Sequence, residues 1–199
     1  MEDEQMSGED LKFLFECVSK NTRLRELNVS GNQFGSDGLE ILSDYLISKL
    51  KIRDLSINRI KLDQTGILHI SKLLTNANLK YLKMRAINMS PDAHFFKVLS
   101  MNSTLCYLDF SRNGLDDEGV RALFLNLKNN SALKYLNISK KYDKTLSIHV
   151  TYMTELLQNN STLESLLMSR HRISNDVSES DLNNFFQALK YNKSISTLD

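Results

Sequence analysis

Histidine, cysteine and acidic side chains are the groups through which this chain could hold a metal ion or catalyse a reaction. The histidines are scattered, with no HxxxH pair, at His69, His94, His149 and His171. Zinc sites need several Cys or His ligands at defined spacing. We therefore predict no metal ion and no cofactor, a core-packing role for His69, and a turn role for His171.

The cysteines and the carboxylates do not form a catalytic pattern either. Cys106 lies beside Leu105 in a strand-like segment without a neighbouring histidine, and Cys17 lies in an apolar helical segment where we expect it to be buried. The acidic run Asp116–Glu118 suits a helix start better than acid–base catalysis, and neither GxxxxGK[ST] nor GxGxxG occurs. We read Gly31 and Gly35 as turn glycines, and we predict that the chain is not an enzyme.

The bulk composition limits the remaining function classes. Hydrophobic residues make up 41% and charged residues 25% of the chain, which is typical of a folded domain. The formal net charge of +1 argues against a nucleic-acid or membrane role. No signal peptide or CxxC pair is present, so we expect a cytoplasmic protein with an acidic tail at residues 1–9 and one domain at residues 10–199.

One phrase recurs along the chain: Asn, two residues, Leu or Ile, two residues, Leu, one residue and an apolar residue. Clear copies are NTRLRELNV, NANLKYLKM, NSTLCYLDF, NSALKYLNI and NSTLESLLM, with weaker copies at Lys49 and Asn192. The first Leu or Ile of each copy is Leu24, Ile52, Leu79, Leu105, Leu133, Leu163 and Ile195. These positions are 26 to 32 residues apart, which indicates a repeat array.

Each repeat has two halves with different periodicities. The phrase alternates core-type and outward residues, as a strand does. The segment before it carries apolar residues three and four positions apart, such as Val120, Leu123 and Leu127, as one face of a helix does. Acidic residues at Asp37, Asp63 and Asp116 mark helix starts, and so does Ser90-Pro91-Asp92, which should place Pro91 in the first turn.

A strand and a helix in every repeat predict an α/β solenoid, with a parallel sheet on its concave side and helices on its convex side. The pattern LxxLxLxxNxL followed by an amphipathic helix resembles the leucine-rich repeat family. Segments such as LCYLDFSRNGLDDEGVRALFL resemble its ribonuclease-inhibitor-like, cytoplasmic subclass. The resemblance runs from about Asp10 to Asp199 and implies six to seven repeats. It also implies that Leu27, Leu55, Leu82, Leu108, Leu136 and Leu166 share one interior.

The sequence departs from the family pattern at several places. The loop asparagine is present as Asn32 and Asn113, whereas Ile60, Ile87, Lys141 and His171 stand at the equivalent positions. Lys140–Lys144 and Arg172–Ser180 look like insertions. We expect a helix without its strand at Leu11–Lys20 and a strand without its helix at Ile195–Asp199. The chain would then be part of a longer array, or its terminal elements would cap themselves or pair with another chain.

Equivalent positions of successive repeats should form columns on the concave face. The position before the second strand Leu gives Glu26, Asp54, Tyr81, Tyr107, Tyr135 and Ser165. Its three tyrosines either stabilise the sheet by cross-strand pairing or form a binding stripe. A second column, from the turn after the strand, supplies Arg59, Arg112, Lys140 and Arg170, with Arg85 beside Ala86. Lys83 and Asp109 lie in a third, mostly polar column.

These columns predict a protein-interaction scaffold that binds a partner with acidic and apolar surface. The resemblance also implies alternatives: a regulator of a small GTPase, or an actin-filament capper of the tropomodulin kind. The Asn-, Lys- and Ser-rich, Pro-poor composition leaves open a third reading, a pathogen effector that binds a host protein.

Overall fold

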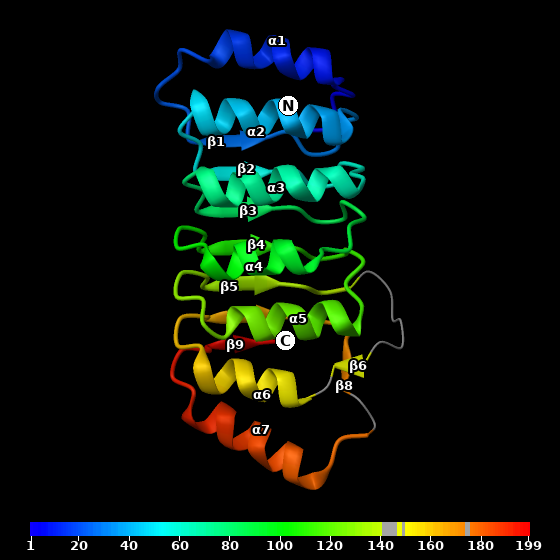
Figure 1. Ribbon diagram of the computed structural model, residues 1–199, viewed down its shortest axis with the longest axis vertical. Helices are drawn as coiled ribbons and strands as arrows, with labels where there is room; N and C mark the ends of the chain where they lie inside the picture. Colours follow the sequence, from blue (N-terminus) through cyan, green and yellow to red (C-terminus); the bar gives the residue numbers. More distant parts are fainter. Residues whose placement is uncertain (141–146, 149, 174–175) are drawn as a thin grey trace.

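The computed structural model describes residues 1–140, 147–148, 150–173 and 176–199. In this part of the chain, helices and strands alternate as the periodicity predicts (Figure 1). The helices are α1 Gly8–Val18, α2 Gly35–Ser48, α3 Gln64–Asn76, α4 Ala93–Met101, α5 Asp117–Leu127, α6 Val150–Asn159 and α7 Glu179–Tyr191. The main-sheet strands are β1 Glu26–Asn28, β2 Asp54–Ser56, β3 Tyr81–Lys83, β4 Tyr107–Asp109, β5 Tyr135–Asn137, β7 Ser165–Leu167 and β9 Thr197–Leu198.

The main sheet is parallel throughout, and its strand order follows the chain. Figure 1 shows the units stacked along the long axis, with the helices in one layer that covers one face of the sheet. Neighbouring strands are about 4.8 Å apart, whereas neighbouring helices need about 10 Å. Because the helix layer is therefore the wider one, such a stack curves so that the helices lie on its convex side and the sheet on its concave side. We call the sheet face that points away from the helices the concave face.

The six predicted strand leucines form one buried column. Leu27 pairs with Leu55, and the register continues in this way through every later strand. None of the six is more than 4% exposed. The six leucines therefore belong to one apolar core that runs through neighbouring repeats, as the solenoid prediction requires.

The helix starts follow the predicted caps with three differences, and the first is that Asp37 lies inside the first turn of α2 and does not cap it. Asp63, Asp92 and Asp116 cap α3, α4 and α5, and each accepts a hydrogen bond from a backbone N–H of the first turn. Pro91 precedes the cap of α4, so the prediction that it lies in the first turn is wrong, because Asp92 takes the capping position. The first helix starts at Gly8, three residues before the predicted Leu11, because Ser7 and Asp10 form a capping box.

Two loop asparagines hold the turns after their strands. The amide of Asn113 donates to the carbonyls of Phe110 and Ser111 in its own turn, and to that of Met84 one repeat earlier. Asn32 donates in the same way to Val29 and Ser30. Ile60 and Ile87 are instead fully buried in the core. Asn113 therefore supports the preceding turn as well, where Ile87 replaces the asparagine.

The longer C-terminal repeats carry a feature that the sequence did not predict. A second, two-stranded parallel sheet pairs β6, Ser147–Ile148, with β8, Arg172–Ile173. Lys141, His149 and most of the predicted insertion at Lys140–Lys144 lie outside the described residues. None of the described helices is long and apolar enough to cross a bilayer.

Candidate binding surface

The tyrosine column crosses the middle of the concave face. Tyr81, Tyr107 and Tyr135 occupy equivalent positions on β3, β4 and β5. The rings of Tyr107 and Tyr135 are parallel within 4°, with centroids 4.1 Å apart, and the ring of Tyr81 lies 5.8 Å from that of Tyr107 at a tilt of 36°. The stacking supports the cross-strand pairing that the sequence left open, and Tyr81 still has 45% of its surface exposed.

Burial within this column affects the acidity of the Tyr107 hydroxyl. Burial raises the pKa of Tyr107 above its ordinary value, and a hydrogen bond with Tyr135 raises it further. Tyr107 is therefore a neutral phenol throughout the physiological range. The column presents aromatic rings and uncharged hydroxyls, a combination common in protein-binding surfaces.

A hollow of about 460 Å3 adjoins the tyrosines on the N-terminal side of the concave face. Glu26, Asp54, Tyr81 and Lys83 supply its charged and aromatic lining. Burial raises the pKa of the Asp54 carboxyl, and the neighbouring Glu26 raises it further, while Lys83 and Arg53 partly oppose the shift. Lys83 pairs in register with Asp109 on the next strand, so charges of both signs lie beside the tyrosines.

The predicted basic edge lies at the turn after the strands, where the backbone is left-handed. Arg59, Arg112 and Arg170 have φ values of 58°, 59° and 66°, and Ala86 shares this conformation at 55°. Such values favour glycine, and Gly31 stands there in the first repeat with φ 72°. Lys140 and Arg85 are half-buried, so the exposed part of this edge rests mainly on the three arginines.

The acidic N-terminal residues neutralise one end of that edge. The Arg59 guanidinium lies 3.0 Å from the Glu2 carboxylate and 2.7 Å from the Asp3 carboxylate. The Asp3 amide also donates to the Ser30 carbonyl. A Cβ on Gly31 would collide with the Asp3 carboxyl, so this docking requires glycine there. Arg59 is therefore engaged within the chain.

Residues 1–6 have the same turn conformation as residues 84–89, residue by residue. Asp3 and Gln5 have φ values of 58° and 57°, as Ala86 and Asn88 have 55° and 58°. The amide of Asn32 donates to the Met1 carbonyl as that of Asn113 donates to the Met84 carbonyl. The predicted tail thus has the conformation of a repeat's turn, although residues 1–6 carry none of the periodic pattern of the repeats.

Sequence reasoning also missed a ladder of asparagines where the helices lead into the strands. Asn102, Asn130, Asn160 and Asn192 each donate their amide to a carbonyl of the preceding repeat and accept backbone N–H groups of their own turn. The asparagine that begins each phrase was the sequence signal that could have predicted this ladder. Asn76 also begins a phrase, but it is exposed because α3 continues through it.

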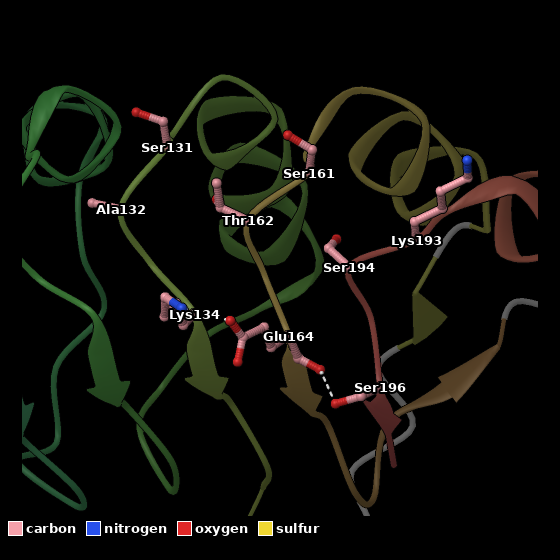
Figure 2. A pocket seen from close by; sticks show the side chains of 9 residues that line it. All are labelled: Ser131, Ala132, Lys134, Ser161, Thr162, Glu164, Lys193, Ser194 and Ser196. Carbon is pink, nitrogen blue, oxygen red and sulfur yellow. Dashed lines mark hydrogen bonds and ion pairs between the residues drawn. The ribbon is translucent and has the colours of Figure 1, made fainter.

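Beside this ladder lies an open hollow of about 510 Å3, shown in Figure 2. Hydroxyl groups of Ser161, Thr162 and Ser194 line it. Lys134 forms an ion pair of 2.6 Å with Glu164 across it. The sequence did not single out this edge of the sheet, which lies opposite the predicted basic edge.

The candidate catalytic and metal-binding residues stay apart. Cys17 is exposed on α1, so the prediction that it is buried is wrong, because it lies outside the helix face that carries Leu11 and Phe15. Cys106 is half-buried, with its thiol 3.5 Å from the Thr104 carbonyl. His69 is half-buried rather than in the core. Among the described residues, no group of three His, Cys, Asp or Glu side chains could hold a metal ion.

The His171 ring occupies the loop-asparagine column, as predicted. Its Nε2 donates to the Ile138 carbonyl at 3.0 Å, as Asn113 donates to the Met84 carbonyl one repeat back. Burial lowers the pKa of His171 and outweighs the opposing effect of this hydrogen bond. His171 is therefore a turn residue whose imidazole replaces an amide.

Comparison with known proteins finds sequences that are similar to these repeats. A sequence model described as Leucine Rich repeat matches residues 20–43 and 102–124. The chain is 31% identical over 115 residues to the NACHT, LRR and PYD domains-containing protein 3 of Bos taurus. It is 29% identical over 127 residues to the corresponding human protein 13. These matches cover 58% and 62% of this chain but only 9% and 12% of those proteins.

Two solved structures are similar over most of the chain. One is a tropomodulin C-terminal domain from Caenorhabditis elegans, with a TM-score of 0.49 and 11% identity, over 94% of this chain and 93% of that one. The other is an internalin from Listeria monocytogenes, with a TM-score of 0.48 and 19% identity, over 100% of this chain and 65% of that one. The two matched segments and the parallel strand–helix units together show a solenoid with the fold of leucine-rich repeats.

Proposed function

We propose that this chain is a non-catalytic scaffold that binds a partner protein on its concave face, with the tyrosine column as the central contact. The observation that carries the proposal is the run of Tyr81, Tyr107 and Tyr135 across three adjacent strands. Aromatic side chains in the centre of a surface supply large contact area at low entropic cost. Leucine-rich repeat domains generally serve as protein-binding scaffolds, and the names of the two aligned relatives include such repeats.

The charges around the tyrosine column indicate which kind of partner surface would fit there. Arg112 and Arg170 lie at the turn edge, while Glu26 and Asp54 lie near the other end of the face. A partner could place apolar side chains on the tyrosine rings and carboxylates beside the arginines, and it would then complement both the tyrosine column and the turn edge. We therefore propose a partner with mixed acidic and apolar surface.

Replacement of Tyr81 by alanine tests this proposal. Tyr81 is the most exposed of the three rings and is not part of the parallel stack. We expect Tyr81→Ala to weaken binding by more than about 1 kcal/mol. Tyr107→Ala should weaken binding as much and should also cost about 1 kcal/mol of stability through its lost stacking. The partner would be captured with the wild-type chain, identified, and titrated against each variant by calorimetry.

Tyr191→Ala supplies the matched control. Tyr191 is 69% exposed on α7, in the helix layer, so this variant removes the same chemical group from another face. Unchanged affinity of Tyr81→Ala and Tyr107→Ala for the captured partner would contradict binding through the concave face. So would an equal loss on mutation of Tyr191.

A further inference from the structure

Cations line the edge of the sheet where the helices lead into the strands. The residue directly before each of the first three strands is Arg25, Arg53 or Lys80. The Arg53 amide donates to the Arg25 carbonyl at 2.7 Å, and the Lys80 amide donates to the Arg53 carbonyl at 2.8 Å. The three positions are therefore direct neighbours in the ladder. Like charges at such neighbouring positions repel each other.

A hollow of about 370 Å3 opens at this edge, where α2 and α3 end. Arg25, Lys51 and Arg53 supply its charges, and the buried side chains of Leu50 and Ile52 form its apolar floor. The Arg25 guanidinium donates to the carbonyls of Thr22 and Leu24, at 2.7 and 3.0 Å. These bonds fix one cation at the rim before any ligand arrives. We call this feature the basic hollow.

The cations of the basic hollow, Arg25, Lys51 and Arg53, form no ion pair with any carboxylate among the residues that the structure describes. Lys134, at the position equivalent to Arg25 and Arg53, is instead neutralised by Glu164 (Figure 2). Glu26 and Asp54 follow Arg25 and Arg53 directly in the sequence and lie on the strands, in register with each other. Within the described residues, the cations at the N-terminal end of this edge are thus free of direct ion pairs, although Arg53 still acts on the Asp54 carboxyl through space.

We propose that the basic hollow binds an acidic segment of a partner polypeptide, with carboxylates on Arg25, Lys51 and Arg53 and one aliphatic side chain on the apolar floor. Charge complementarity selects an anionic segment. Arg25 and Arg53 lie in adjacent rows about 5 Å apart, a spacing that neighbouring residues of an extended peptide can bridge. A nucleic-acid strand would find no aromatic stacking partner among the lining residues, which are aliphatic, amide or basic. This surface is separate from the tyrosine column and does not depend on it.

A labelled peptide of glutamates around a single leucine is the probe, titrated against the full chain by fluorescence anisotropy. We expect saturable binding that weakens with added salt. Charge reversal at all three positions, Arg25→Glu, Lys51→Glu and Arg53→Glu, should weaken it at least about tenfold. Replacing the peptide's leucine by serine should weaken it less, because only the contact with the floor is lost. Circular dichroism would show that each variant is folded.

Two controls separate this site from general charge and from the tyrosine column. Lys12→Glu, Lys97→Glu and Lys190→Glu change the net charge equally on the helix layer, and together they should leave peptide affinity within about twofold. Tyr107→Ala should leave it unchanged, whatever that variant does to the concave-face partner. Absence of saturable peptide binding, or an equal loss in the lysine control, would overturn the proposal. Tighter arginine-dependent binding of single-stranded RNA or phosphatidylserine vesicles would also overturn it.

Discussion

Single side chains in this solenoid act on two repeats at once. Asn130 donates to the carbonyls of Leu99 and Asn102, both in the preceding repeat, and accepts the amides of Ala132 and Leu133 in its own turn. All four bonds lie between 2.8 and 2.9 Å, and the residue is 4% exposed. Hydrogen bonds of this kind join helix-to-strand turns that the apolar core does not cover.

Asn130→Ala should therefore be strongly destabilising. The variant leaves two carbonyls and two amides without partners in a buried site, and we expect it to lower the free energy of unfolding by about 2–4 kcal/mol. Urea denaturation followed by circular dichroism measures this change. Asn76→Ala is the matched control, since Asn76 is exposed, and its effect should stay below about 0.5 kcal/mol. Equal effects of the two substitutions would show that the ladder adds nothing to stability.

His171 makes stability depend on pH. Its folded pKa lies below the ordinary value, chiefly through burial. The unfolded chain therefore binds the proton more readily, and the stability from neutral His171 is present above the ordinary histidine pKa. It should begin to be lost as pH falls through the ordinary histidine pKa of about 6.5, and it should be gone once pH lies below the lowered pKa of folded His171.

His171→Asn provides the test, because asparagine supplies a donor for the Ile138 carbonyl without titrating. We expect thermal unfolding of the variant to change less with pH over this range than that of the wild type. The control is His94→Asn, which alters an exposed histidine on α4 and should keep the wild-type pH dependence. The same pH dependence in all three proteins would contradict the role assigned to His171.

At the scale of elements, the turns after β1, β2, β3, β4 and β7 each place one residue in the left-handed region, and at this position the residue is glycine only in the first of them, at Gly31. Arg112 adopts φ 59° there and is exposed. The left-handed conformation costs a non-glycine residue about 1–2 kcal/mol, whereas glycine's greater freedom in the unfolded chain costs about 0.5–1 kcal/mol. Arg112→Gly should therefore leave stability unchanged or raise it by up to about 1 kcal/mol.

Arg112→Val is the contrasting variant, because a β-branched side chain is poorly tolerated at positive φ. We expect it to lower the midpoint of thermal unfolding relative to both wild type and Arg112→Gly, as measured by differential scanning calorimetry. Both substitutions remove the same charge, so any difference between them reports the backbone and not the basic edge. A valine variant as stable as the glycine variant would refute the argument.

The periodicity predicted the elements well because each strand and each helix buries apolar residues at the spacing typical of that element. The spacing of Leu108 and its equivalents placed every main-sheet strand, and the aspartates placed the starts of α3 and α5. It could not predict the turn made by residues 1–6, because that turn depends on hydrogen bonds to Asn32 and an ion pair with Arg59. It also missed that Arg25 and Arg53 form no ion pair within the described ranges, which depends on where the carboxylates of neighbouring repeats lie.

At the scale of the whole molecule, charge is separated although the net charge is close to zero. Acidic residues 2 and 3 cover the start of the turn edge, and the opposite edge keeps its cations in the first three repeats. The tyrosine column lies between these two edges on the concave face. A formal net charge of +1 therefore conceals distinct surfaces, which is why the bulk composition gave no indication of the basic hollow.

Among the described residues the core is one cluster that neighbouring repeats share, so the position of a substitution along the stack should determine its effect. Leu108 is 1% exposed in the middle of the leucine column, and Leu198 is 38% exposed at the end of the sheet. We expect Leu108→Ala to lower the free energy of unfolding by about 3 kcal/mol, and Leu198→Ala to lower it by less than about 1 kcal/mol.

Hydrogen exchange of the wild-type chain should show the same gradient. Amides of β3 and β4 have neighbours on both sides and should exchange only through global unfolding, whereas those of β9 should exchange through local fraying. Leu108→Ala should accelerate exchange on both sides of the substitution, because each repeat covers the apolar face of the next. If Leu108→Ala changed exchange only within β4, the repeats would be independently stable, and a shared interior would not hold the array together.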